Sequence, residues 1–213
     1  MRRRHAVLAA VSAAALILGA VVPARAETPT EELRRYTDRV LAIVRSPSLS
    51  PRDKRLAVQQ VAVEVFDVGE TARRALGVHW QARTPAERLE FVRLFRDLLE
   101  RTYVDRIDEY GGESLRFLDE RVEGDLARVR GLIVTAAGLE VPVESRLALK
   151  DGRWRVYDVI LANVSLVANY RAQFDRIIRA SSYEDLVKRL KARVELLSDR
   201  EPEAGRGAKP ERR

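Results

Sequence analysis

Three segments in the first half of the chain begin with the same short pattern and continue with apolar residues at helical spacing. In each, a Ser or Thr precedes a Pro, and an acid follows three residues after the hydroxyl: "TPTE" from Thr28, "SPRD" from Ser50 and "TPAE" from Thr84. The hydroxyl can accept a hydrogen bond from a free backbone N–H, Pro is favoured at the first helical position, and the acid stabilises the positive helix end. We therefore predict a helix start at each. The expected buried faces are Leu33, Tyr36, Val40 and Ile43; then Leu56, Val61 and Val65; then Leu89, Val92, Phe95, Leu99, Tyr103 and Ile107.

Further helices are predicted from apolar spacing elsewhere. The stretch "FDVGETARRALGVHW" indicates a short helix that begins at Asp67 and ends at Gly77. Near the C-terminus, helical spacing returns in two groups of residues. These are Tyr170, Phe174, Ile177 and Ile178, followed by Leu186, Leu190, Val194 and Leu197.

Between these helical regions, from about Gly112, apolar and polar residues alternate. The stretches "SLRFLDERV", "DLARVRGLIVT", "EVPVESRLALK" and "GRWRVYDVIL" have the period of two that is typical of strands with one face in water. The Asp-Gly pair of "KDG" predicts a hairpin between the last two strands. The order is helices, a four-stranded antiparallel meander and helices again, so we predict an α+β fold.

The segment from Val156 to Val167 is more apolar than a strand with one wet face needs to be. Only Asp158, Asn163 and Ser165 interrupt it as clearly polar residues, yet it is too short to span a membrane. Either the protein core or a bound ligand must therefore cover it.

The N-terminal 26 residues have the three parts of a secretory signal peptide. A basic start, Arg2 to Arg4, precedes an apolar stretch from Ala6 to Val22 and an Ala-Arg-Ala site that ends at Ala26. We predict cleavage after Ala26 and export to the periplasm; an uncleaved anchor is the alternative. The chain has no cysteine, so an exported protein of this sequence is stabilised by its core without disulfides.

Charge and composition limit the partners and the domain boundaries. The chain of 213 residues has a net charge of +7, and the signal segment carries four arginines and no acid, which leaves +3 (7 − 4). The remaining charges are interleaved, which argues against nucleic-acid binding. Residues 27–197 form one predicted domain, and the polar, Pro- and Gly-containing residues 198–213 form a predicted disordered tail.

The residues offer little for catalysis. After the signal segment, His79 is the only histidine, and the chain has no cysteine. The missing cysteine excludes a Cys-His pair, and the single histidine excludes a multi-histidine zinc site. Asp158 stands between apolar neighbours, and we interpret it as a buried acceptor for a backbone or Arg donor; a general base is the alternative. We expect no enzyme activity, no cofactor and no metal.

Two motifs, in order, resemble the MlaC (toluene-tolerance) family. They are "ALGVHW…TPAERLEFVRLFRDLLERTY" and "GRWRVYDVILANVSLVANYRAQF", and the similarity extends from about Glu32 to Leu197. The matching residues are Leu76, Gly77, Trp80, Phe91, Phe95, Tyr103, Trp154, Tyr157, Asp158, Val164, Ser165, Leu166, Asn169, Tyr170, Arg171 and Phe174. Asn163 stands where the family usually has Gly, and Asn also tolerates a positive φ.

The resemblance implies a periplasmic carrier of phospholipid. It implies a strongly curved antiparallel sheet and helices that enclose an apolar cavity. It also implies transfer between an outer-membrane lipoprotein complex and an inner-membrane ABC transporter complex, by a monomer that maintains lipid asymmetry. A cavity of about 1,000 Å³ is expected for a diacyl lipid.

On this interpretation apolar and aromatic side chains of the predicted helices and strands bind the lipid. They are Phe91, Phe95, Leu99, Tyr103, Val129, Val143, Leu147, Val159, Leu161, Val167, Tyr170 and Phe174. Tyr170 and Arg171 would face the glycerol or phosphate end, although Arg171 could instead pair with Asp158 or Asp175.

Three other functions stay open at this point. The same residues could fill the core of an exported interaction module that carries no lipid. A hopanoid-associated branch of the family shares the fold, which leaves the lipid class open. An enzyme that uses Asp158 is the third.

Overall fold

A computed structural model describes residues 27–105, 107 and 110–199, and it confirms the three capped helix starts. Helices α1 (Pro29–Arg45), α2 (Pro51–Val65) and α4 (Pro85–Leu99) begin directly after Thr28, Ser50 and Thr84. In α1 and α4 the hydroxyl and the acid form a reciprocal capping box. Helix α3 (Val68–Leu76) lies between Asp67 and Gly77, as predicted. The predicted signal peptide lies outside the described residues.

The sheet has five antiparallel strands, so the prediction of four needs correction. Strands β1 (Ser114–Glu123), β2 (Leu126–Val134), β3 (Glu140–Lys150) and β4 (Arg153–Leu161) form the expected meander, and β5 (Val164–Ser165) adds a short edge in the order β1-β2-β3-β4-β5. The extra hairpin turns at Ala162 and Asn163, which both have positive φ, at 47° and 65°. Two such residues make a type I′ turn, the same type that Asp151 and Gly152 make before β4.

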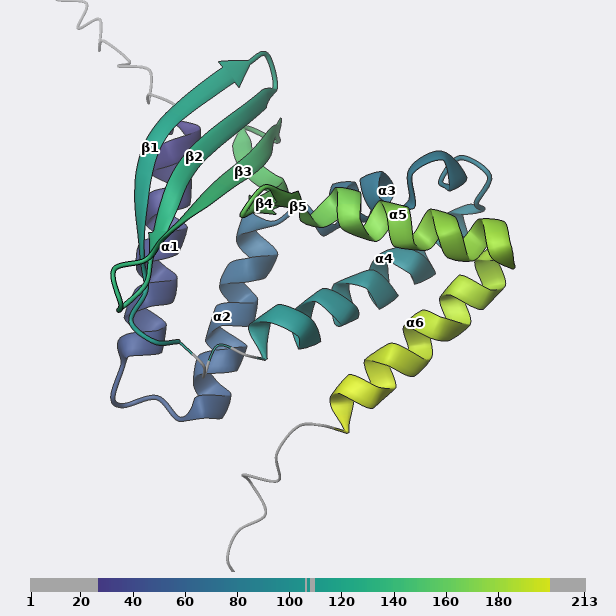
Figure 1. Cartoon of the computed structure of the whole chain (residues 1–213), viewed down its shortest axis with the longest axis horizontal. Coiled ribbons are helices and arrows are strands. Elements are labelled where there is room, and N and C mark those ends of the chain that lie inside the picture. Colours follow the sequence, from purple (N-terminus) through teal and green to yellow (C-terminus); the bar gives the residue numbers. More distant parts are fainter. Residues whose placement is uncertain (1–26, 106, 108–109, 200–213) are drawn as a thin grey trace, which may run out of the picture.

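Two bulges interrupt the strand register and bend the sheet. One lies between Phe117 and Asp119 in β1. In the other, Arg146 pairs with Asp158 and Leu147 with Val156, which leaves Tyr157 as the extra residue of β4. Figure 1 shows the long strands arching over α1, with α2 beside it.

The core is divided into two clusters of buried side chains. One lies between the sheet and helices α1 and α2, and contains Leu33, Tyr36, Val129, Leu147 and Val156. The other joins α3 and α4 to the C-terminal helices α5 (Leu166–Ala180) and α6 (Tyr183–Ser198). Figure 1 shows these four helices on the side of the molecule away from β1. The α+β prediction is confirmed.

The buried face of α4 is rotated from the predicted one. Leu89 is 74% exposed, whereas Phe91, Leu94, Phe95 and Leu98 are buried at the spacing of a helical stripe. The regular helix ends at Leu99 and continues as a one-turn π-helix, η2 (Glu100–Val104). On α2, Leu56 is likewise exposed, and Val58 takes its place in the core.

At the C-terminus, α6 includes Ser198, the first residue of the predicted tail. Residues 200–213 lie outside the described part of the chain. No helix among the described residues has the length and apolar character needed to cross a membrane.

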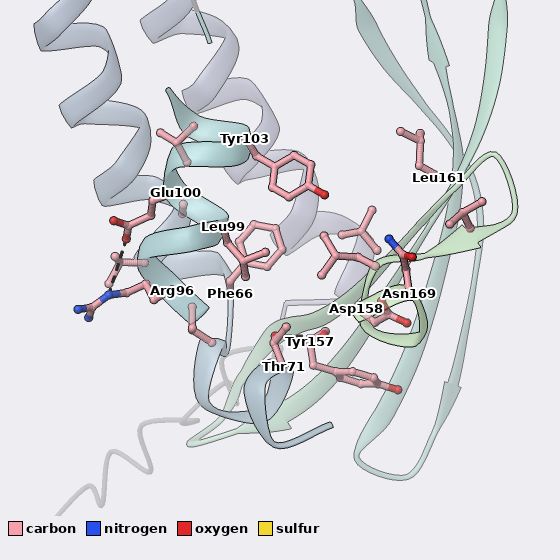
Figure 2. Close-up of a pocket in the computed structure, with 17 residues that line it drawn as sticks. Phe66, Thr71, Arg96, Leu99, Glu100, Tyr103, Tyr157, Asp158, Leu161 and Asn169 are labelled. Carbon is pink, nitrogen blue, oxygen red and sulfur yellow. Dashed lines mark hydrogen bonds and ion pairs between the residues drawn. The ribbon is translucent and has the colours of Figure 1, made fainter. Parts of the chain in front are cut away.

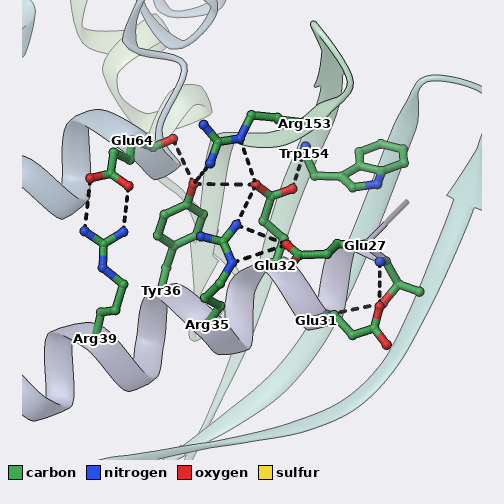
Figure 3. Close-up of polar contacts among 10 residues, drawn as sticks. Glu27, Glu31, Glu32, Arg35, Tyr36, Arg39, Glu64, Arg153 and Trp154 are labelled. Carbon is green, nitrogen blue, oxygen red and sulfur yellow. Dashed lines mark hydrogen bonds and ion pairs between the residues drawn. The ribbon is translucent and has the colours of Figure 1, made fainter. Parts of the chain in front are cut away.

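A buried carboxylate fastens α1 to the start of β4 (Figure 3). Glu32 is 3% exposed, and its Oε2 accepts a hydrogen bond of 2.8 Å from the backbone N–H of Trp154. Its Oε1 lies 3.2 Å from Nη2 of Arg35 and 3.5 Å from the hydroxyl of Tyr36. Since these groups satisfy the buried acceptor, the polar cluster fixes the helix on the curved sheet.

Candidate functional site

An apolar cavity of about 470 Å³ lies between the two core clusters. Its walls come from α2, the start of α3, η2, the second half of β4, β5 and the start of α5 (Figure 2). The residues that line it are Ala62, Val63, Phe66, Val68, Thr71, Arg96, Leu99, Glu100, Tyr103, Val104, Tyr157, Asp158, Val159, Leu161, Val164, Leu166 and Asn169.

One part of the lining is exposed and marks the mouth of the cavity. Val63 on α2, Tyr103 on η2, and Leu161 and Val164 on the β4–β5 hairpin are about half exposed although they also line the cavity. Figure 2 shows Tyr103 and Leu161 on opposite walls. An apolar molecule could therefore enter between η2 and the hairpin without passing through the packed core.

The charged side chains of the lining already have partners. Glu100 accepts a hydrogen bond of 2.8 Å from Nε2 of Gln59, and Arg96 lies 3.6 Å from Asp97 and 3.9 Å from Glu100. The remaining charged residue is Asp158, which is 4% exposed. The cavity thus offers apolar contact and no unpaired charge within the described lining.

Asp158 is held by donors from the turn that leads into α5. Its Oδ1 accepts from the backbone N–H of Val167 at 3.0 Å, and its Oδ2 accepts from the hydroxyl of Ser165 at 2.7 Å. Nη1 of Arg146 lies 3.7 Å from the same Oδ2. These contacts confirm that Asp158 is a buried acceptor.

Four of the residues predicted to bind lipid line the cavity. Leu99 and Tyr103 do so from the end of α4 and from η2, and Val159 and Leu161 do so from β4. Val159 and Leu161 point to this side because the bulge at Tyr157 shifts the alternation of β4 by one residue.

The other predicted residues lie elsewhere. Phe91, Phe95 and Phe174 form an aromatic cluster, and the ring of Tyr170 lies 5.0 Å from that of Phe95. Val129 and Leu147 are buried between the sheet and α1 and α2. Val143 is half-buried opposite Gly131 of β2, and Val167 is buried beside the lining residue Leu166.

Arg171 does not contact either carboxylate that the sequence suggested. Its Nε donates to the backbone carbonyl of Arg74 at 2.8 Å, and its aliphatic part packs 3.3 Å from the position of a Cβ at Gly77. This contact joins α5 to the end of α3. Asp175 instead accepts from Arg179, and one of its oxygens lies 2.8 Å from Nε2 of His79.

Sequence reasoning missed the wall that α2 and α3 contribute. Ala62 and Val63 adjoin the buried Val61, and Phe66 and Val68 flank the break between the two helices. The sequence did contain a sign of this wall, because Ala62 and Val63 are apolar although they lie outside the buried stripe of α2. Such residues indicate a second covered face, which a single-stripe interpretation overlooks.

The cavity has about half the expected volume of 1,000 Å³. Figure 2 shows the side chains of Phe66, Leu99 and Tyr103 on the wall that faces β4 across the cavity. The hydrogen bond from Gln59 to Glu100 holds α2 against η2 on this side.

The chain is similar to known proteins over most of the region that forms this fold. A sequence model of the family described as MlaC protein matches residues 34–192. The chain belongs to the MlaC family. This match covers most of the region over which the two motifs resemble the family, and it confirms the resemblance.

Two relatives connect the MlaC fold to lipid. The chain is 22% identical over 146 residues to the intermembrane phospholipid transport system binding protein MlaC of Haemophilus influenzae, an alignment that covers 66% of this chain and 68% of that protein. It is also similar to a phospholipid-binding protein from Ralstonia solanacearum that was solved in complex with a phospholipid. That similarity has a TM-score of 0.70 and 25% identity, and covers 78% of this chain and 97% of the other.

Proposed function

We propose that this MlaC-family chain binds a phospholipid in the apolar cavity and carries it between the outer and inner membranes. The observation that carries the proposal is the cavity itself, in a fold shared with a protein solved with a phospholipid bound. Its lining joins aliphatic and aromatic side chains from α2, η2, β4 and β5, which is the composition that acyl chains require.

The energetics explain why a carrier needs such a cavity. A diacyl lipid has roughly 30 methylenes, and burial of each contributes ~0.8 kcal/mol, so release into water costs on the order of 20 kcal/mol. Leu99, Val159 and Leu161 offer apolar surface that replaces the bilayer. A phosphate head group would need a cation or water as its partner. Because no unpaired cation lies within the described lining, we place the head group at the mouth, where it meets water.

Loading of a diacyl lipid requires a larger space than 470 Å³. We infer that α2 and η2 separate on loading, because side chains of both elements fill the space beside them. The hydrogen bond of 2.8 Å from Gln59 to Glu100 would have to break or shift in this step. Phe91, Phe95 and Phe174 keep their places in this view and support the wall from behind.

The cellular setting follows from the same proposal. Export after cleavage at Ala26 would place the chain in the periplasm, as a monomer that meets an outer-membrane lipoprotein complex and an inner-membrane ABC transporter complex. The chain would act by binding alone, without catalysis. Among the described residues, no group of three His, Cys, Asp or Glu side chains could hold a metal ion.

Native mass spectrometry of residues 27–213, purified from a bacterial periplasm without detergent, tests the proposal. We expect a mass increment of one phospholipid that is lost on denaturation and identified by fragmentation. A mass increment of a hopanoid would support a lipid carrier but with a hopanoid, and not a phospholipid, as its cargo. A bare polypeptide under all gentle conditions would contradict the carrier and favour an interaction module.

A further inference from the structure

A second hollow, of about 220 Å³, lies on the outer face of the sheet. The residues that line it are Arg121, Glu123, Leu126, Ala127, Arg128, Arg146 and Tyr157. Ala127 and Val129 are buried against the helices, so Arg128 between them points to the opposite face of β2. This face is turned away from α1 (Figure 1).

Three arginines stand directly opposite one another across this face. Arg121 of β1 pairs with Arg128 of β2, and Arg128 pairs with Arg146 of β3. Like charges at opposed positions of neighbouring strands destabilise a sheet. By itself such a row lowers the stability of the sheet, and at its end Arg146 stands opposite Asp158 of β4.

The row is only partly neutralised by its own neighbours. Arg121 forms an ion pair with Glu123, two residues along the same strand, and both side chains are mostly exposed. Arg146 bonds to Glu144 at 3.0 Å, and its Nη1 lies 3.7 Å from Oδ2 of Asp158. Arg128 has neither a hydrogen bond nor an ion pair with the described part of the chain, and it is exposed. The centre of the row thus keeps an unpaired guanidinium.

We propose that this hollow is a docking site for an acidic segment of a partner protein, which places a carboxylate among Arg121, Arg128 and Arg146. Guanidinium groups bind carboxylates with paired, charge-assisted hydrogen bonds. Tyr157 supplies an aromatic wall, and the guanidinium of Arg74 covers its ring at 3.9 Å. Leu126 adds an apolar edge for the partner's backbone.

The charge pattern favours a narrow acidic segment over a membrane surface. The next row of the same face contains Asp119 and Glu144 on either side of Arg130. A flat anionic membrane would meet these carboxylates together with the arginines, and the repulsion would offset the attraction. A side chain that reaches into the hollow meets mainly the arginines.

The hollow also adjoins the back of the lipid cavity. Tyr157 belongs to both linings, and Arg146 lies 3.7 Å from Asp158, which lines the cavity and holds the start of α5. A docked partner would therefore contact the cavity wall from outside. The docking itself does not depend on bound lipid, so a measurement of peptide binding separates it from the proposed carrier function.

The test measures the affinity of a labelled tetra-glutamate peptide for residues 27–213 by fluorescence anisotropy at low ionic strength. We expect saturable binding that Arg128→Glu weakens at least tenfold and Arg128→Lys weakens less. Arg52→Glu makes the same change of charge at an exposed residue in the first turn of α2 and should alter the affinity less than twofold. Amide shifts in NMR spectra should centre on Leu126, Ala127 and Tyr157.

Several outcomes would overturn the docking site. Equal weakening by Arg128→Glu and Arg52→Glu would show attraction by net charge alone. Displacement of the peptide by millimolar inorganic phosphate, with the same amide shifts, would show a general oxyanion site. Sedimentation with phosphatidylglycerol vesicles that is lost in Arg128→Glu would assign the face to a membrane.

Discussion

The carboxylate of Asp158 accepts a hydrogen bond of 3.0 Å from the backbone N–H of Val167, and this bond joins β4 to the first turn of α5. Asp158 also accepts from Ser165, whose hydroxyl oxygen in turn accepts from the N–H of Ala168. The carboxylate therefore lies at the positive end of α5, where a negative charge is stabilised. One buried side chain thus fixes two walls of the cavity relative to each other.

Replacement of Asp158 by Ala should lower the free energy of unfolding by about 2–3 kcal/mol. The change leaves the N–H of Val167 and the hydroxyl of Ser165 without their acceptor, and hydrogen bonds to charged groups contribute about 1.5–3 kcal/mol. Asp158→Asn should cost less, because the amide oxygen can still accept one of the bonds. Urea denaturation measures both, and wild-type stability of Asp158→Ala would contradict this role.

A bulky residue at Leu161 should block the cavity with little loss of stability. Leu161 lines the mouth and is 46% exposed, so a Trp there can occupy space that lipid would take. We expect Leu161→Trp to change the free energy of unfolding by less than about 1 kcal/mol. Bound phospholipid in native mass spectra should fall at least fivefold.

The matched control is Leu147→Trp on the neighbouring strand. Leu147 is fully buried in the cluster between the sheet and the helices, and overpacking there costs about 1–3 kcal/mol or more. If Leu161→Trp lost as much stability as Leu147→Trp, the space at Leu161 would be filled core rather than a cavity.

Local signals in the sequence were enough to predict most elements of the fold. Three hydroxyl residues mark helix starts: Thr28, Ser50 and Thr84. Each accepts a hydrogen bond from a backbone N–H three residues later, so the signal is contained in a short stretch of sequence. Asp151 and Gly152 mark a hairpin for the same reason. The hairpin at Ala162 was missed, because Ala is uncommon at a positive φ and the strand it leads to has two residues.

The lining of the cavity was harder to predict, because cavity walls and dry cores use the same residue types. Phe95 and Leu99 lie four residues apart on one helix, yet Phe95 is fully buried among rings and Leu99 lines the cavity. The difference depends on the positions of α2 and β4 in the tertiary structure, which the local sequence of α4 does not determine. The bulge at Tyr157 likewise decides which side chains of β4 face inward, and no alternation pattern reveals it.

Alkaline pH should destabilise the helical layer through Tyr170. Burial raises the pKa of the Tyr170 phenol to about 12, and the neighbouring Tyr103 adds to the effect. In the unfolded chain the pKa is about 10, so the folded state holds this proton more tightly. The stabilisation is complete below pH 10 and is lost as the pH rises towards 12.

Urea denaturation between pH 8 and 12 would measure this effect. The free energy of unfolding of the wild type should fall above pH 10, and that of Tyr170→Phe should fall less steeply. Burial also raises the pKa of Tyr183 to about 12, so part of the decline persists in the variant. Identical slopes for the two proteins would remove Tyr170 as a cause.

Replacement of Ala162 by Gly should stabilise the protein. Ala162 has a φ of 47°, in the left-handed region that costs an L-residue roughly 1–2 kcal/mol, and Gly adopts it freely. The greater freedom of Gly in the unfolded chain offsets about 0.4–1 kcal/mol of that gain. The expected net increase in the free energy of unfolding is therefore about 0.5–1 kcal/mol.

The matched control is Ala172→Gly, at an exposed position inside α5. There the φ is helical, so Gly should lower the free energy of unfolding by about 1 kcal/mol. Opposite signs for the same chemical change, measured by urea denaturation, would show that the strained turn sets the sign. A loss of stability in both variants would mean that the turn tolerates Ala162 without strain. In that case the turn between β4 and β5 would form equally well without a residue that favours positive φ. The position of Val164 at the mouth of the cavity would then not depend on such a residue.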